Sequence, residues 1–238
     1  MKRTPQPLSG AGTPPPMLSR MGGVALLAVL AVLAACSSAP PVPDWQMNAK
    51  GALERAQDAY LAGKPRVETA EFSKARSEVT STGRADLLAR IELARCATRV
   101  ASLVFEDCAG FTLLAQDAAA PERAYAAYLA GRAQPQDVAL LPEQHRAIAG
   151  AGAAAGAGLA SMRDPLARLV AAGVLLQTRR AEPAVIAAAI DTASAQGWRR
   201  PLLAWLGVQA QRADAAGDAT EAARIRRRIS LASGGSPN

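Results

Sequence analysis

Residues 85–104 read ADLLARIELARCATRVASLV, and this stretch decides the fold class. Apolar side chains recur at spacings of three and four residues, as in Leu87, Ile91 and Ala94, and the pattern continues to Ala101. One face of an α-helix repeats in this way, whereas a half-buried strand alternates at every second residue. The stretch therefore predicts a helix over 85–104 with one buried face.

The composition favours helices throughout the chain. The 238 residues are 50% hydrophobic but only 4% aromatic, and roughly a quarter of them are Ala. Ala is the best helix former, whereas strands favour β-branched and aromatic residues. One His and three Cys leave few ligands for a zinc site or for a triad built on histidine. We expect an all-α domain packed through small side chains, without a metal or another non-covalent cofactor.

Proline and glycine mark where the predicted helices begin and end. Several Pro residues each precede an apolar-periodic run, and Gly residues follow the ends of others, as helix termini favour. We expect nine or ten helices over 45–232, paired as antiparallel hairpins, and a disordered tail over 233–238. The prolines are Pro121, Pro142, Pro165, Pro183 and Pro201, the glycines are Gly63, Gly197 and Gly217, and the expected N-caps are Asp164 and Asp218.

Two helices are predicted ahead of the 85–104 stretch. The first runs from about Trp45 to the stop signal at Gly63. The second covers about 66–80, and its spacing places five side chains on the inward face, namely Val67, Ala70, Phe72, Ala75 and Val79.

A short motif occurs twice. Tyr60–Lys64 (YLAGK) recurs 68 residues later as Tyr128–Arg132 (YLAGR), and 68 is twice the 34-residue tetratricopeptide period. With Gly63 as the central glycine, Phe72 and Ala75 fall on the second-helix Phe and Ala of that motif, so the stretch resembles a degenerate tetratricopeptide repeat. The Trp, the Ala that starts the second helix and the final Pro of the motif are missing. The resemblance implies a solenoid of stacked hairpins, and an irregular helical array or bundle is the alternative.

An apolar segment near the N-terminus has the marks of an export signal. Met21–Ala35 is uninterrupted, follows a basic region with Lys2, Arg3 and Arg20, and ends at Cys36. At 1.5 Å per residue it spans roughly 22 Å, which is less than the ~30 Å hydrocarbon core of a bilayer. A basic region, a short apolar run and small residues before a cleavage site are typical of a secretory signal.

The residues at the end of this segment, Leu33-Ala34-Ala35-Cys36, resemble the lipobox of bacterial lipoproteins. The resemblance implies a signal peptide over 1–35 that is cleaved between Ala35 and Cys36. It also implies a diacylglyceryl group on the Cys36 thiol and an acyl chain on the new amine. Ser37, in place of Asp, then implies sorting to the outer membrane, with the domain facing the periplasm. An ordinary signal peptide with a chance Cys and a retained transmembrane anchor are the alternatives.

The residues that follow Cys36 look like a tether. Residues 36–44 are rich in Pro and Ser, show no periodicity and would hold the domain within ~25 Å of the membrane when extended. A translation start at Met17 instead of Met1 would leave the more usual basic region MLSR before the apolar run.

The basic excess lies toward the C-terminus. The formal net charge of +7 falls to +4 when the three basic residues of the signal are removed, and Arg224, Arg226, Arg227 and Arg228 form the densest basic group. This group could contact an anionic lipid surface or another polyanion, or it could be a solvated helix face close to a helix C-terminus. Nucleic acid is not an expected partner, because export removes the chain from it.

Two cysteines remain after lipidation of Cys36. In an oxidising compartment the pair Cys96 and Cys108 is predicted to form a disulfide. Two buried free thiols are the alternative, and a catalytic redox pair lacks the C-x-x-C motif.

Few other residues suggest chemistry. His145 is the single imidazole and is predicted to be exposed in a first helical turn. The glycines of 150–158 superficially resemble a dinucleotide loop, but no strand precedes them, so they predict a close helix crossing or a flexible helix end. Trp205 is predicted to lie in the core. Trp198 is expected to pack at a turn, or alternatively to line a groove for a partner.

These observations favour a lipid-anchored envelope protein. We expect a non-catalytic scaffold or adaptor that binds an envelope protein or peptide, because stacked hairpins form concave binding surfaces. The alternatives are an envelope enzyme or ligand carrier with an unrecognised site, and a structural link between the membrane and an anionic polymer.

Overall fold

The computed structural model describes residues 41–152 and 155–234. The predicted signal peptide, the lipobox with Ala35 and Cys36, and most of the tether therefore lie outside the described residues, as do the last four residues. The description below concerns the compact unit that begins at Pro43.

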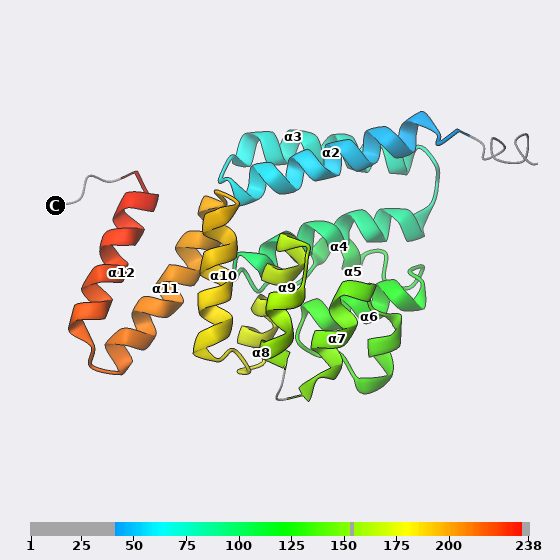
Figure 1. Ribbon diagram of the computed structural model, residues 1–238. Coiled ribbons are helices and arrows are strands. Elements are labelled where there is room, and N and C mark those ends of the chain that lie inside the picture. The colour runs from blue at the N-terminus through cyan, green and yellow to red at the C-terminus, as the bar shows by residue number, and fades with distance from the viewer. Residues whose placement is uncertain (1–40, 153–154, 235–238) are drawn as a thin grey trace, which may run out of the picture. The chain divides into compact units, whose positions relative to one another are not determined.

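Within the described residues, this unit is built from helices alone and holds no strand, which confirms the predicted all-α class (Figure 1). The 13 helical elements are α2 (Asp44–Leu61), α3 (Pro65–Thr80), α4 (Ala85–Ala101), α5 (Ala109–Thr112), α6 (Ala120–Leu129), η2 (Pro135–Leu140), α7 (Glu143–Gly150), α8 (Ala155–Gly158), η4 (Leu159–Ser161), α9 (Pro165–Gln177), α10 (Pro183–Ala195), α11 (Arg199–Ala215) and α12 (Ala219–Ala232).

The first two helices form an antiparallel hairpin, α2 against α3 (Figure 1). Gly63 ends α2 with a φ of +78°, a conformation that glycine adopts without strain, and Pro65 begins α3. The prediction that Val67 and Ala70 face inward is wrong, because both are exposed. The predicted inward positions Phe72, Ala75 and Val79 are confirmed as buried, and Glu68 is buried with them.

Helix α4 packs against α3, α6 and α9. It ends at Ala101, three residues before the predicted end at Val104. Leu103 adopts a φ of 60°, which an L-residue with a side chain rarely occupies, and the amide of Val104 donates back to the carbonyl of Arg99. The apolar run continues past the helix, but its backbone has already left the helical conformation.

The core of the unit is centred on α9, which is buried over most of its length. Helix α9 crosses α4 at Gly173, where an added Cβ would lie 2.4 Å from the backbone oxygen of Val100. The predicted N-cap Asp164 is confirmed, since its Oδ1 accepts hydrogen bonds from the amides of Leu166 and Ala167. The small side chains that the composition led us to expect therefore bring α4 and α9 into backbone contact.

The last two helices, α11 and α12, form a second hairpin (Figure 1). Gly217 ends the turn between them with a φ of +74°, and Asp218 caps α12 by accepting from the amide of Glu221. Trp205 of α11 is fully buried, as predicted, and its indole N–H donates to the carbonyl of Ala101 at 3.2 Å. This bond joins α11 to the end of α4.

The two copies of the YLAG motif end helices in the same way. Gly63 and Gly131 both have positive φ, and each amide donates to the carbonyl of the Tyr three residues earlier, Tyr60 or Tyr128. The chain then takes different paths, because a 16-residue helix follows Gly63, whereas η2 and the short α7 follow Gly131. The described residues thus form an irregular helical array at this point, and the motif marks a shared helix ending.

Candidate functional site

A cavity with a volume of about 580 Å³ lies between α4, α6, α7 and α9. Helix α4 contributes Leu93 and Ala97 to its wall, and α9 contributes Val170. Because α4 and α9 touch near Gly173, the remaining space opens beside their crossing. A cavity of this size, apolar with a few polar groups, is in the range of small-molecule sites in proteins.

An ion pair borders this cavity. Nε of Arg90 donates to Oε1 of Glu122 at 2.6 Å, joining α4 to the first turn of α6. The Glu122 side chain is 6% exposed, whereas that of Arg90 is 60% exposed. The second carboxylate oxygen of Glu122 is buried and has no hydrogen-bond partner within the described part of the chain. Such an oxygen loses its hydration without compensation, which costs about 1–3 kcal/mol or more for a charged group.

An aromatic cluster contributes Tyr125 and His145 to the wall. The rings of Tyr125 and Tyr128 lie 5.6 Å and 5.0 Å from the ring of His145, and the Tyr128 hydroxyl is 3.5 Å from His145 Nδ1. His145 lies in the first turn of α7 as predicted, but the prediction that it is exposed is wrong, because it is 1% exposed. Burial lowers the pKa of His145 to about 4, although the Asp164 carboxylate acts in the opposite direction. The imidazole is therefore neutral at pH 7.

This burial predicts a dependence of stability on pH. The unfolded chain binds the proton of His145 near its ordinary pKa of about 6.5, and the folded chain binds it only near pH 4. Protonation of His145 therefore favours the unfolded chain as the pH falls below about 6.5. Between pH 7 and pH 4 it lowers the free energy of unfolding by about 3 kcal/mol. Chemical denaturation at both pH values should show this loss relative to His145→Phe, which keeps a ring and does not titrate. Equal pH dependence in the two proteins would contradict it.

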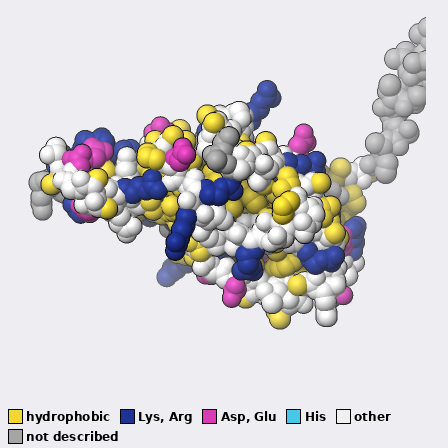
Figure 2. Space-filling model, turned by 90° about the horizontal axis from the view of Figure 1, so that it is seen from below, with side chains coloured by type: hydrophobic (Ala, Val, Ile, Leu, Met, Phe, Trp, Pro, Cys, Tyr) yellow, Lys and Arg dark blue, Asp and Glu magenta, His cyan; other side chains and the backbone are white. Residues whose placement is uncertain are grey.

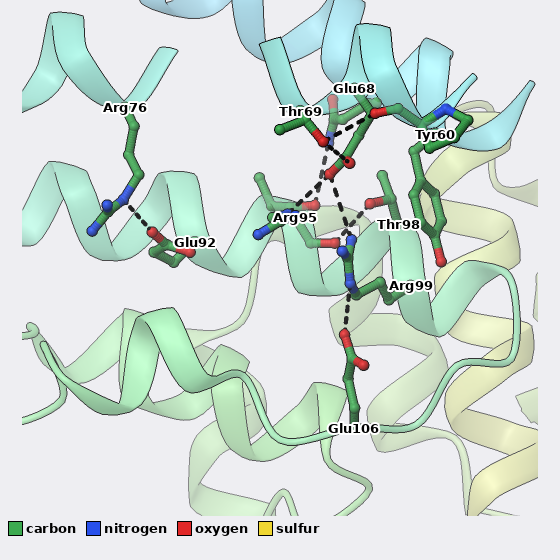
Figure 3. A network of polar contacts seen from close by, with 12 residues as sticks. Tyr60, Glu68, Thr69, Arg76, Glu92, Arg95, Thr98, Arg99 and Glu106 are labelled. Carbon is green, nitrogen blue, oxygen red and sulfur yellow. Dashed lines mark hydrogen bonds and ion pairs between the residues drawn. The ribbon is translucent and has the colours of Figure 1, made fainter. Parts of the chain in front are cut away.

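A second polar network holds α3 against α4 (Figure 3). Oε1 of the buried Glu68 accepts from Arg95 Nε at 2.9 Å and lies 3.7 Å from Arg99, whose Nε contacts Glu106 at 2.6 Å. Arg76 pairs with the buried Glu92 at 2.6 Å. Glu68 and Glu92 are each paired with an arginine of the neighbouring helix, so we interpret the network as a structural link between α3 and α4.

The cysteines that the sequence pairs are brought together. Cys96 of α4 and Cys108, just before α5, have Cα atoms 5.9 Å apart, a separation typical of disulfides. They line a second cavity, of about 350 Å³, together with Phe105 and Phe111. Val104 and Phe105 are large apolar side chains that remain 37% and 41% exposed there.

The C-terminal arginines lie along α12 and not at its end. Arg224 pairs with Glu221 at 2.5 Å, and Arg226 pairs with Asp214 of α11 at 2.6 Å. At the end of the molecule that holds α12, basic and acidic side chains lie next to one another on the face shown in Figure 2. Half of this basic group, which also includes Arg227 and Arg228, is therefore matched by nearby carboxylates.

Trp198 is half-buried at the turn before α11 and packs against the main core, in agreement with the turn-packing interpretation. Of the glycines in 150–158, Gly150 is the last residue of α7, and Gly156 and Gly158 lie in the short helix α8.

Residues 41–152 and 155–234 contain no group of three or more His, Cys, Asp or Glu side chains placed to hold a metal ion.

Sequence reasoning missed Arg90, Glu122 and Tyr125, which line the larger cavity, and Tyr128, which contacts His145 of its wall. The spacing of the two tyrosines, three residues apart on one helix, places both rings on one face and was the available signal. Glu122 follows Pro121 in a first helical turn, where an acid is ordinary, so its burial against α4 left no trace in the local sequence.

Comparisons with protein-family models, with curated proteins and with solved structures find no match to this chain.

Proposed function

We propose that this chain is a lipid-anchored protein of the bacterial cell envelope whose helical unit is a non-catalytic adaptor for a protein or peptide partner. The observation that carries the proposal is the segment Met21–Cys36, which combines a short apolar run with a lipobox-like ending. Two or three acyl chains at Cys36 would hold the protein on an outer-membrane leaflet facing the periplasm. Each methylene group that enters the bilayer contributes ~0.8 kcal/mol to this binding.

The described residues are compatible with attachment through lipid. None of their helices has the length and the apolar character that crossing a bilayer requires. Helix α2 begins at Asp44, eight residues after Cys36, so the helical unit would stay within ~25 Å of the lipid.

The adaptor role draws support from the surface beside the second cavity. Val104 and Phe105 expose apolar area there, next to a hollow lined by further apolar side chains. Exposed apolar side chains at a concave surface are typical of protein-binding sites. Cross-linking in intact cells followed by mass spectrometry would identify the partner, and a double variant Val104→Ser, Phe105→Ser should lose the cross-linked product while remaining membrane-bound.

The anchor is tested by Cys36→Ser. The wild-type protein should incorporate radiolabelled palmitate and sediment with the membrane fraction, whereas the variant should do neither. Cys108→Ser is the matched control, since it also removes one thiol and should leave both the label and the fractionation unchanged. A Cys36→Ser protein that still sediments with membranes would overturn the anchor.

An envelope location also predicts a disulfide between Cys96 and Cys108. Alkylation of the protein from cells without reductant should leave both cysteines unmodified. The bond closes a loop with a sequence separation of 12, so replacing both residues by Ser should lower the free energy of unfolding by ~3 kcal/mol in the chain-entropy model. Denaturation with and without reductant measures this difference, and full alkylation of both thiols would contradict the expected compartment.

A further inference from the structure

The larger cavity has a use that the adaptor role does not require. We propose that the cavity between α4, α6, α7 and α9 binds a small amphipathic amine, with an apolar body against the wall and a protonated amino group directed to Glu122. This site does not depend on the lipid anchor.

The first argument is the buried acceptor. Glu122 is 5% exposed, borders the cavity and uses only Oε1 for Arg90, so Oε2 is an acceptor without a donor among the described residues. Hydrogen bonds between charged groups are the strongest that a carboxylate can accept, and an ammonium head supplies them. A ligand of this class would satisfy the oxygen that the folded chain leaves without a partner.

The second argument is the distribution of charge around the cavity. The arginines of the wall, Arg90 and Arg146, are exposed, and each already donates, to Glu122 and to the carbonyl of Leu141. The interior instead presents the Glu122 carboxylate and a histidine that is neutral at pH 7. Arg90 therefore occupies Oε1 alone and Arg146 is bonded to a backbone carbonyl, so Oε2 is the acceptor left for a second cationic donor.

The third argument is the shape and chemistry of the remaining wall. Leu93, Ala97, Leu141 and Val170 supply apolar surface, and the rings of Tyr125 and His145 lie stacked beside them. Aromatic faces attract both apolar groups and organic cations. A volume of about 580 Å³ exceeds that of a ligand with about ten non-hydrogen atoms.

The experiment uses the purified protein with three probes of the same body. These are 2-phenylethylamine, 2-phenylethanol and 3-phenylpropanoate, which carry an ammonium, a hydroxyl and a carboxylate, and their affinities are measured by isothermal titration calorimetry. We expect the amine to bind about tenfold more tightly than the alcohol, the difference that one charge-assisted hydrogen bond supplies. Equal affinities, tighter binding of the carboxylate, or no binding of the amine would each overturn the proposal.

Two variants locate the site. Glu122→Gln should reduce the affinity for the amine about tenfold, to that of the alcohol. Glu92→Gln is the matched control, because Glu92 is equally buried and paired with an arginine but does not border the cavity. Reduced amine affinity in both variants alike would place the effect outside the cavity.

A measurement on the wild-type protein covers the case in which Glu122→Gln does not fold. Addition of 2-phenylethylamine should shift the methyl resonances of Ala97, Leu141 and Val170 in NMR spectra. The methyls of Val104 and Ala126, which line the second cavity, should not shift. Shifts confined to the second cavity, or no shifts, would overturn the proposed site.

Discussion

Replacing Trp205 by Ala is expected to lower the free energy of unfolding by about 3–5 kcal/mol. The side chain is fully buried, so the substitution leaves a cavity at the junction of α11 with the end of α4. It also removes the indole N–H that donates to the carbonyl of Ala101 at 3.2 Å. The lost apolar contacts and the unpaired buried carbonyl act in the same direction.

Denaturant unfolding followed by circular dichroism measures this effect. Trp198→Ala is the matched control, because Trp198 is half-buried at the turn and should cost markedly less. Trp205→Phe should fall between the wild-type protein and Trp205→Ala, since it retains the ring but loses the donor. If Trp205→Ala cost no more than Trp198→Ala, Trp205 would not be a central core residue.

The second large effect is expected for Gly173→Ala. In an ordinary helix interior this change stabilises by about 1 kcal/mol, because Ala is the better helix former. At Gly173 the new Cβ would lie 2.4 Å from the backbone oxygen of Val100 and 3.0 Å from its Cγ1. A backbone atom cannot rotate away, so α4 and α9 must separate, and we expect a net loss of about 3 kcal/mol, at the upper end for overpacking.

Gly207→Ala is the control for this prediction. Gly207 also lies within a helix, α11, but a Cβ there would meet nothing within 4 Å. Thermal denaturation should therefore show a higher midpoint for Gly207→Ala and a lower one for Gly173→Ala. A higher midpoint for both would mean that the crossing of α4 and α9 is looser than the structure has it.

The features predicted best are those that depend on residues close together in the sequence. Helix ends marked by Gly63 or Gly217, and the cap formed by Asp164, depend on residues within one turn, and all three lie where we expected them. The periodicity predicts an end of α4 that is too late, because apolar residues continue to Leu103 and Val104 although the backbone has turned.

The candidate site was harder to predict because its groups come together through tertiary contacts. A glutamate in a first helical turn is normally solvated, yet Glu68 and Glu122 are buried against arginines 27 and 32 residues away in the sequence. His145 was expected in water for the same reason, since its polar neighbours in sequence gave no sign of Tyr125 and Tyr128.

The hydrogen bonds that reach α11 have a consequence for folding kinetics. Arg200 donates to the carbonyl of Tyr60 across 140 residues, and Trp205 donates to that of Ala101 across 104. Contacts between residues so far apart in the sequence form late, because a long loop must first close. During synthesis, these two hydrogen bonds can therefore form only after most of the chain has emerged. A fragment ending before α11 would lack both of these side-chain donors, although the Tyr60 carbonyl would keep its bond from the Gly63 amide, so α11 is expected to complete a cooperative folding unit.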